Sequence, residues 1–241
     1  MKKGKDYLVF PLDCSSVKEA EHYVRILAHR VGMFKIGLEL FIHQGPEIVQ
    51  MIRDLSPVDI FLDLKLHDIS ATVKKAMERA VATKADFVTV HCSSSRKMLE
   101  MAVEGGQGKT GVLGVTLLTD NDSSVVRDAG FKEKYVANTD LLVLKRAEMA
   151  FDTGCRGVVC SGREACLIKK RFGKDFLVVT PGIRPAFTKL TNDDQKRIVT
   201  PAMAVGAGAD FIVVGRPVRT AADPAAAADA IAREIEKALD I

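Results

Sequence analysis

The charged residues with the clearest chemical pattern lie in one short apolar stretch of the chain. Asp63, Lys65 and Asp68 fall within six positions of IFLDLKLHDIS (60–70). Removing an ion from water costs several kcal/mol unless it is paired. Asp13 and Lys35 lie in the two apolar runs that precede this stretch. Such a pattern indicates either an ion-pair network that stabilises the fold or a catalytic site.

The spacing of these residues predicts where their side chains point. Side chains alternate along a strand, so Phe61, Asp63, Lys65 and His67 are predicted to share one face, and the intervening leucines should pack on a helix layer. A lysine between two carboxylates is held protonated. It is then suited to donate a proton to a carbanion and to stabilise it, and poorly suited to Schiff-base chemistry. The pattern favours acid catalysis at carbon.

Short apolar runs recur along the chain, and each is followed by a longer segment with helical spacing of apolar residues. The runs are 7–13, 33–40, 60–66, 87–92, 111–119, 157–162, 176–183 and 211–217. Strands that alternate with helices predict a parallel sheet. Eight such units over 1–241 favour an α/β fold of one domain, a (β/α)8 TIM barrel, over an open sheet. Neighbouring strands lie about 4.8 Å apart, so Asp13, Lys35, Asp63 and Lys65 should form one cluster with alternating charge at the carboxyl ends of the first three strands.

Local signals refine this pattern of elements. Ser16 and Ser70 are predicted to cap the helices that follow them. The segments KADFVTVH and GADFIVVG resemble each other, and both run through Ala-Asp-Phe into a strand. Two polar loops add length after the fifth and seventh strands, at 120–140 and 184–196. The second is a candidate lid, and a solvated insertion is the alternative for each.

The last two strands are predicted to supply a phosphate site. The seventh run ends in TPGIRP and the eighth in VVGRP, and the loops at these positions of a barrel often bind phosphate. Gly215 allows close backbone approach and Arg216 supplies several donors. Arg184 and Gln195 flank the candidate lid and are placed to close over the same anion.

Composition excludes several other classes of function. The net charge of +4 is mild, aromatic residues make up 6% and Trp is absent, which argues against nucleic acid binding. Five cysteines without a C-x-x-C pair are typical of a reduced, cytoplasmic protein, and no apolar run is long enough to span a membrane. His67 and His91 could bind a metal, but the sequence offers no convincing ligand set, so a structural role is favoured for both and no metal is predicted.

The motifs FKIG, DLKLHDI, TPGIRP, DDQKR and VVGRP, in this order and spacing, closely resemble the orotidine 5′-phosphate decarboxylase family. The resemblance extends from Asp13 to Arg216. It implies removal of CO2 from orotidine 5′-phosphate to give UMP, the last step of de novo pyrimidine nucleotide synthesis, without a metal or an organic cofactor. D-x-K-x-x-D alone is less specific, because related phosphate-binding barrels share it.

The resemblance also implies roles for individual residues. Lys35, Asp63, Lys65 and Asp68 would form the catalytic charged array, in which Lys65 stabilises and protonates a carbanion at pyrimidine C6 and Asp63 crowds the departing carboxylate. The remaining matched residues would bind the substrate: Asp13 and Lys35 the ribose, Thr119 the pyrimidine, and Arg184, Gln195, Gly215 and Arg216 the phosphate.

A homodimer is implied as well, because Asp68, Ile69 and Thr72 match residues that enter the neighbouring subunit's site. The chain departs from the family's frequent D-I-P-N-T-V pattern at Ser70 and Ala71, and has HCSSS where glycines are common. Two alternatives remain. One is a metal-dependent sugar-phosphate decarboxylase or aldol-type lyase that uses the same carboxylates, and the other is a phosphate-ligand sensor without catalysis.

Overall fold

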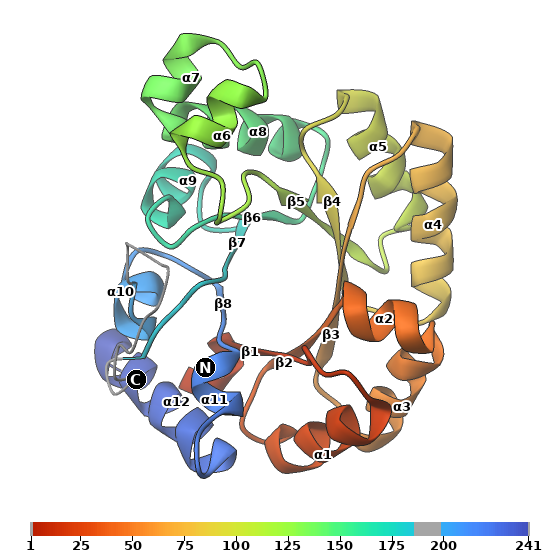
Figure 1. Ribbon diagram of the computed structural model, residues 1–241, viewed down its shortest axis with the longest axis vertical. Helices are drawn as coiled ribbons and strands as arrows, with labels where there is room; N and C mark the ends of the chain where they lie inside the picture. The colour runs from red at the N-terminus through yellow and green to blue at the C-terminus, as the bar shows by residue number, and fades with distance from the viewer. Residues whose placement is uncertain (1, 186–198, 241) are drawn as a thin grey trace.

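Eight parallel strands close into a barrel in the computed structural model, which describes residues 2–185 and 199–240 (Figure 1). The strands pair in chain order, and β8 returns to β1 through Leu8 and Ile212. The strands are β1 Leu8–Pro11, β2 Met33–Gly37, β3 Asp59–Leu66, β4 Phe87–His91, β5 Gly111–Val115, β6 Gly157–Val159, β7 Leu177–Thr180 and β8 Phe211–Val213. The predicted single-domain (β/α)8 TIM barrel is therefore confirmed.

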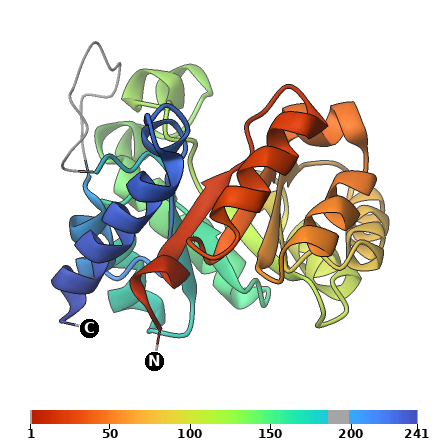
Figure 2. The same cartoon turned by 90° about the horizontal axis from the view of Figure 1, so that it is seen from below.

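Helices surround the strands on the outside of the barrel, as Figures 1 and 2 show from two directions. Within the described ranges, none of them is long and apolar enough to cross a membrane. A 3-10 helix, η1 Gly4–Tyr7, precedes β1, and the α-helices are α1 Val17–Leu27, α2 Leu38–Gln44, α3 Glu47–Leu55, α4 Ser70–Ala82, α5 Arg96–Gly105, α6 Ser123–Asp128, α7 Glu133–Ala137, α8 Thr139–Asp152, α9 Ala165–Phe172, α10 Pro201–Gly206, α11 Arg216–Arg219 and α12 Pro224–Leu239.

Two layers of apolar side chains hold the barrel together. The inner layer fills the barrel and consists of Val9, Met33, Phe61, Leu113, Val179 and Val213. The outer layer lies between strands and helices, and Leu62, Leu64 and Leu66 pack in it. The predicted division of β3 into an inner face with Phe61 and an outer leucine face is confirmed in this part of the strand.

Some element boundaries differ from the prediction. The apolar runs 33–40, 111–119 and 211–217 extend past their strands, because the chain enters α2 at Leu38, turns after Val115, and enters α11 at Arg216. Helix propensity and turn geometry therefore end the strands earlier than apolar composition indicates.

One of the two predicted helix caps is confirmed. The Ser16 hydroxyl accepts the backbone N–H of Glu19 at 3.2 Å and caps α1. The prediction for Ser70 is wrong, because Ser70 is already the first residue of α4 and Ile69 occupies the cap position. In the part of the chain that the structure describes, no side-chain hydrogen bond caps α4, and the Asp68 carboxylate accepts the N–H of Ile69, the residue before the helix, at 2.6 Å.

The 120–140 insertion folds into α6 and α7 and the start of α8, although its polar composition predicts a loop. Val126 and Val136 of this segment form a small separate core with Leu142 of α8, and Phe131 packs against them. These few apolar positions are enough to order the segment beside the barrel. The other predicted insertion, the candidate lid at 184–196, falls outside the described residues after Pro185.

The aspartates of the two Ala-Asp-Phe segments have the same structural role. The Asp86 carboxylate accepts the N–H of Ile60, and the Asp210 carboxylate accepts the N–H of Val178, each at 2.7 Å. Each aspartate precedes a strand and bonds to the start of the strand before it. A basic residue pairs with each carboxylate, Arg53 with Asp86 and Lys169 with Asp210.

Replacing Asp210 with alanine should lower the free energy of unfolding by about 1–3 kcal/mol, the range for a buried donor left without a partner. The donor is the N–H of Val178. Lys169 also loses its ion pair at 2.6 Å, although it still donates to the carbonyl oxygens of Lys174 and Phe176. Asp210→Asn should cost less, because an amide oxygen still accepts the N–H. Urea denaturation of the three proteins measures both effects, and an alanine variant as stable as the wild type would contradict the assignment.

Candidate active site

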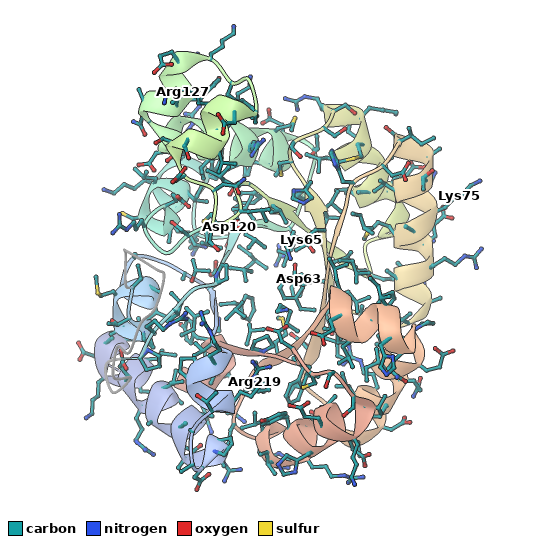
Figure 3. All side chains as sticks on the ribbon, viewed as in Figure 1. Asp63, Lys65, Lys75, Asp120, Arg127 and Arg219 are labelled. Carbon is teal, nitrogen blue, oxygen red and sulfur yellow. The ribbon has the colours of Figure 1, made fainter. Side chains whose placement is uncertain are left out.

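Strands β1, β2 and β3 bring four charged side chains to the carboxyl end of the barrel. Lys35 is paired in register with Pro11 of β1, and Asp63 of β3 lies beside Gly37 of β2. Asp13 follows β1 by two residues. Because parallel strands end on the same side, their terminal side chains meet at one mouth. Figure 3 shows Asp63 and Lys65 next to each other on β3, facing the middle of the ring of strands.

The four side chains form a continuous chain of ion pairs. The Lys35 Nζ lies 3.1 Å from Asp13 Oδ1 and 3.5 Å from Asp63 Oδ2, and the Lys65 Nζ lies 2.9 Å from the same Asp63 oxygen. The order Asp13, Lys35, Asp63, Lys65 therefore alternates in sign, as the spacing predicts. Lys35 is nearly buried, whereas the Lys65 side chain is 30% exposed and can be reached from the barrel mouth.

The groups around Asp63 favour the ionised form of its carboxyl. Burial raises the pKa of its carboxyl, but the positive charges of Lys35 and Lys65 and the hydrogen bonds from Lys65 and Thr89 lower it more. The net effect is a pKa below the ordinary value. A fixed negative charge therefore stands between the two ammonium groups before any ligand arrives.

Asp63 should stabilise the fold in a pH-dependent way. Its folded pKa lies below the ordinary value of about 3.9, so its contribution is present above that value and is lost as the pH falls through the folded pKa. The difference in unfolding free energy between wild type and Asp63→Asn should be constant above about pH 5 and shrink below about pH 4. Urea denaturation across this range measures it, and a difference independent of pH would contradict the assignment.

The backbone of β3 departs from regular alternation at Lys65. Lys65 has a φ of 50°, a left-handed conformation that non-glycine residues rarely adopt. The register with β4 shifts between Leu62 and Leu66, which pair with Val88 and Val90. The prediction that His67 continues the inner face is therefore not supported by the backbone, and His67 is exposed. Pattern-based alternation assumes a regular strand, and this strand has an irregularity between Leu62 and Leu66 before it ends at Leu66.

Thr89 of β4 joins this cluster and was missed by sequence reasoning. Its hydroxyl oxygen accepts the N–H of Lys65 at 2.9 Å and its proton is donated to Asp63 Oδ1 at 3.0 Å. A signal exists in the sequence, because Thr89 is the only hydroxyl residue in the apolar run FVTVHC and alternates with its inward neighbours.

Arg219 was also missed. Arg219 is labelled in Figure 3, and its guanidinium, at the end of α11, donates to the backbone carbonyl oxygen of Asp13. This contact fixes the end of β1 that carries the first carboxylate of the cluster. The sequence holds no signal for it, because the contact depends on how the short helix α11 turns back toward β1.

Asp68, Ile69 and Thr72 lie outside the cluster and are exposed. Ile69, an apolar side chain, is 72% exposed. Among the residues that the structure describes, no ion pair joins Asp68 to Lys65. An open pocket of about 410 Å³ lies here, and its lining consists of His67, Asp68, Ile69, Ser70, Ser94 and Ser95.

The predicted phosphate residues are only partly described. Gly215 directly precedes α11, and Arg216, the first residue of that helix, is exposed. Arg184 is buried, and its Nη1 donates to the carbonyl oxygen of Ile183 at 3.2 Å. Gln195 lies outside the described residues.

Thr119, the predicted pyrimidine contact, is exposed in a turn after β5. It follows Val115, where the strand ends, by four residues. Within the described part of the chain, no hydrogen bond links it to the charged cluster.

His67 and His91 lie together beside the cluster, with ring centroids 5.6 Å apart. Burial lowers the pKa of His91, and the nearby positive charges of His67, Lys65 and Arg146 lower it further. His91 is therefore neutral near neutral pH. Over residues 2–185 and 199–240, no group of three or more His, Cys, Asp or Glu side chains is arranged to hold a metal ion.

Comparisons with known proteins show which family the chain resembles in sequence and in fold. Residues 6–231 match the model of the Orotidine 5′-phosphate decarboxylase / HUMPS family. The chain is 52% identical to the orotidine 5′-phosphate decarboxylase of Desulfosudis oleivorans over 98% of this chain and 95% of that protein, and 41% identical to that of Syntrophotalea carbinolica over 99% and 98%. The crystal structure of orotidine 5′-phosphate decarboxylase from Lactobacillus acidophilus superposes with a TM-score of 0.81 at 32% identity, covering 95% of this chain and 98% of that one.

Proposed function

Because the chain belongs to the orotidine 5′-phosphate decarboxylase family, we propose that it removes CO2 from orotidine 5′-phosphate at the charged cluster and releases UMP. The observation that carries this proposal is the alternating chain of ion pairs that ends at Lys65. It presents the Lys65 amine at the barrel mouth, held by a fixed carboxylate, where its positive charge can stabilise a carbanion.

The chemistry divides between Asp63 and Lys65. When the bond from C6 to the substrate carboxylate breaks, the electron pair stays on C6 and CO2 leaves. The Lys65 ammonium stabilises that pair and then donates a proton to C6, and solvent restores the lysine proton. Asp63, 2.9 Å from the Lys65 Nζ, keeps the ammonium in place and crowds the departing carboxylate.

The same proposal assigns the remaining contacts to the substrate. Asp13 and Lys35, whose side chains are 3.1 Å apart, would hold ribose hydroxyls. The pyrimidine would lie by Thr119, and the phosphate would be bound by Arg184, Gln195, Gly215 and Arg216. Binding energy from a phosphate remote from C6 can be used to assemble the reacting site.

We further propose a homodimer in which Asp68, Ile69 and Thr72 enter the neighbouring subunit's site. Their exposure supports this, above all that of the apolar Ile69. The partner's Asp68 would place a second carboxylate near Lys65, so that the lysine stands between two anions. Neither subunit would hold a complete site alone.

The contacts of the Asp63 carboxylate argue against the metal-dependent alternative. Its Oδ1 accepts a hydrogen bond from Thr89, and its Oδ2 lies within 3.5 Å of both lysine ammonium groups. A carboxylate held by cations and a hydroxyl is arranged as a counter-ion and competes poorly as a metal ligand. This favours decarboxylation without a metal.

A spectrophotometric assay of orotidine 5′-phosphate consumption tests the proposed function. The purified chain should form UMP and CO2 at the same rate with and without EDTA. Activity that is lost in EDTA and restored by Mg²⁺ would support the metal-dependent lyase instead. Binding of UMP without any turnover would support the sensor.

A further inference from the structure

We propose that Thr89 is a positioning residue for the reaction, whose single hydroxyl fixes the Asp63 carboxylate and the Lys65 backbone together. The effect expected on catalysis rests on the proposed function, because Asp63 and Lys65 are the two residues assigned to carbanion chemistry. The structural part rests only on contacts within β3 and β4. Thr89 itself touches no reacting atom and acts through its two neighbours.

The direction of both hydrogen bonds follows from the groups involved. A backbone N–H can only donate, so the Lys65 N–H gives its hydrogen to the Thr89 oxygen at 2.9 Å. The hydroxyl has one proton of its own, and Asp63 Oδ1, 3.0 Å away, accepts it. Thr89 has no solvent exposure, so water does not compete for either bond. The hydroxyl thus connects the two residues in one fixed arrangement.

The Thr89 hydroxyl accepts the N–H of Lys65, a residue with an unusual backbone conformation. Between Leu62 and Leu66 the register with β4 shifts, which takes the Lys65 N–H out of the regular ladder. A lysine with a φ of 50° persists only when its surroundings hold it. The Thr89 oxygen replaces the missing ladder acceptor, and so holds the turn of backbone that aims the Lys65 side chain at Asp63.

The Thr89 hydroxyl also orients the Asp63 carboxylate. With Oδ1 bonded to Thr89, Oδ2 is the oxygen that faces Lys65 at 2.9 Å and Lys35 at 3.5 Å. Without the hydroxyl, Oδ1 loses this hydrogen bond, and the carboxylate is less fixed in orientation although the two lysines still contact Oδ2. Thr89 therefore sets the geometry of three charged groups without carrying a charge.

Two matched variants separate the hydroxyl from the side-chain volume. Thr89→Val keeps the shape and removes the hydroxyl, and should lower kcat by about 10- to 100-fold, the scale for a displacement of about 1 Å at a reacting centre. Thr89→Ser keeps the hydroxyl and should retain most of the activity. The affinity of both variants for UMP should change much less than kcat of the valine variant, because the proposed phosphate contacts lie on other elements and Lys35 keeps its partner Asp13.

A titration of the ligand-free protein tests the same contact without activity. The charged groups that face Asp63 are Lys35 from β2 and Lys65 from its own strand, and Thr89 is the facing hydroxyl from β4. Carbon-13 NMR of labelled aspartate carboxylates should show a higher Asp63 pKa in Thr89→Val and an unchanged one in Thr89→Ser. Thermal unfolding of both variants checks that they fold.

The outcomes distinguish this inference from the proposed function. A valine variant with wild-type kcat and an unmoved Asp63 pKa would overturn it. So would equal losses of kcat and UMP affinity in both variants, which would indicate a general packing role. A wild-type protein without decarboxylase activity would overturn the proposed function, and the carboxylate titration would then decide the role of Thr89 alone.

Discussion

Lys65→Ala should abolish decarboxylation, with kcat lower by about 10⁴-fold or more. The change removes a proton donor, which is worth about 10²–10⁴-fold, and a positive charge beside the developing carbanion, which is worth about 10²–10³-fold. Asp63 stays paired with Lys35 at 3.5 Å, so the rest of the cluster should persist. Steady-state kinetics with orotidine 5′-phosphate measures the loss.

Two controls show whether this loss of kcat is due to the missing proton donor. The Lys65→Ala variant should bind UMP only slightly less tightly than the wild type, because it loses one contact and keeps the proposed phosphate and ribose residues. Lys65→Arg retains a positive charge but holds its proton much more tightly, so its activity should also stay far below the wild type. An alanine variant that keeps more than about one per cent of wild-type kcat would show that another group protonates C6.

Mixing two inactive variants should restore activity. Asp68→Ala alone is expected to lose about 100-fold or more, as for other preorganised charges, and Lys65→Ala alone is inactive. A dimer with one chain of each kind contains one site with an intact Lys65 and an intact partner Asp68. If the chains exchange freely, about half of the dimers are of this kind and the mixture recovers about a quarter of wild-type activity.

The doubly substituted chain is the matched control for this experiment. A chain with both Lys65→Ala and Asp68→Ala, mixed with wild type, should inactivate the wild-type chains that it pairs with, because it supplies no Asp68 to them. If Asp68 instead serves its own subunit, the two single variants stay inactive when mixed and the double variant has no effect on wild type. Ile69, 72% exposed in the single chain, should become protected from solvent in the dimer.

Much of the barrel and its charged cluster could be predicted because both follow from short-range pattern. Apolar runs separated by amphipathic segments predict parallel strands, and parallel strands end together. Charges at the carboxyl ends of consecutive strands must then meet, as Asp13, Lys35, Asp63 and Lys65 do. No knowledge of side-chain conformation is needed for this conclusion.

Features that depend on local breaks in the pattern could not be predicted in the same way. The left-handed backbone at Lys65 and the register shift beside it place the N–H of Lys65 on the Thr89 hydroxyl. Nothing in strand periodicity indicates that shift. The helices of the 120–140 insertion depend on a few apolar residues in a polar segment, including Val126 and Val136. Arg219 reaches Asp13 across nearly the whole chain length, a contact that only the closed barrel creates.

Hydrogen exchange at C6 of the product tests most directly whether Lys65 protonates a C6 carbanion. By microscopic reversibility, the group that donates this proton also removes it, so the protein should exchange the C6 hydrogen of bound 5-fluoro-UMP for deuterium in D2O. The fluorine withdraws electron density and makes the carbanion easier to form. Proton NMR should show exchange with wild type and none above the buffer rate with Lys65→Ala. Exchange at equal rates in both proteins, or no exchange in the wild type, would contradict the central role of Lys65.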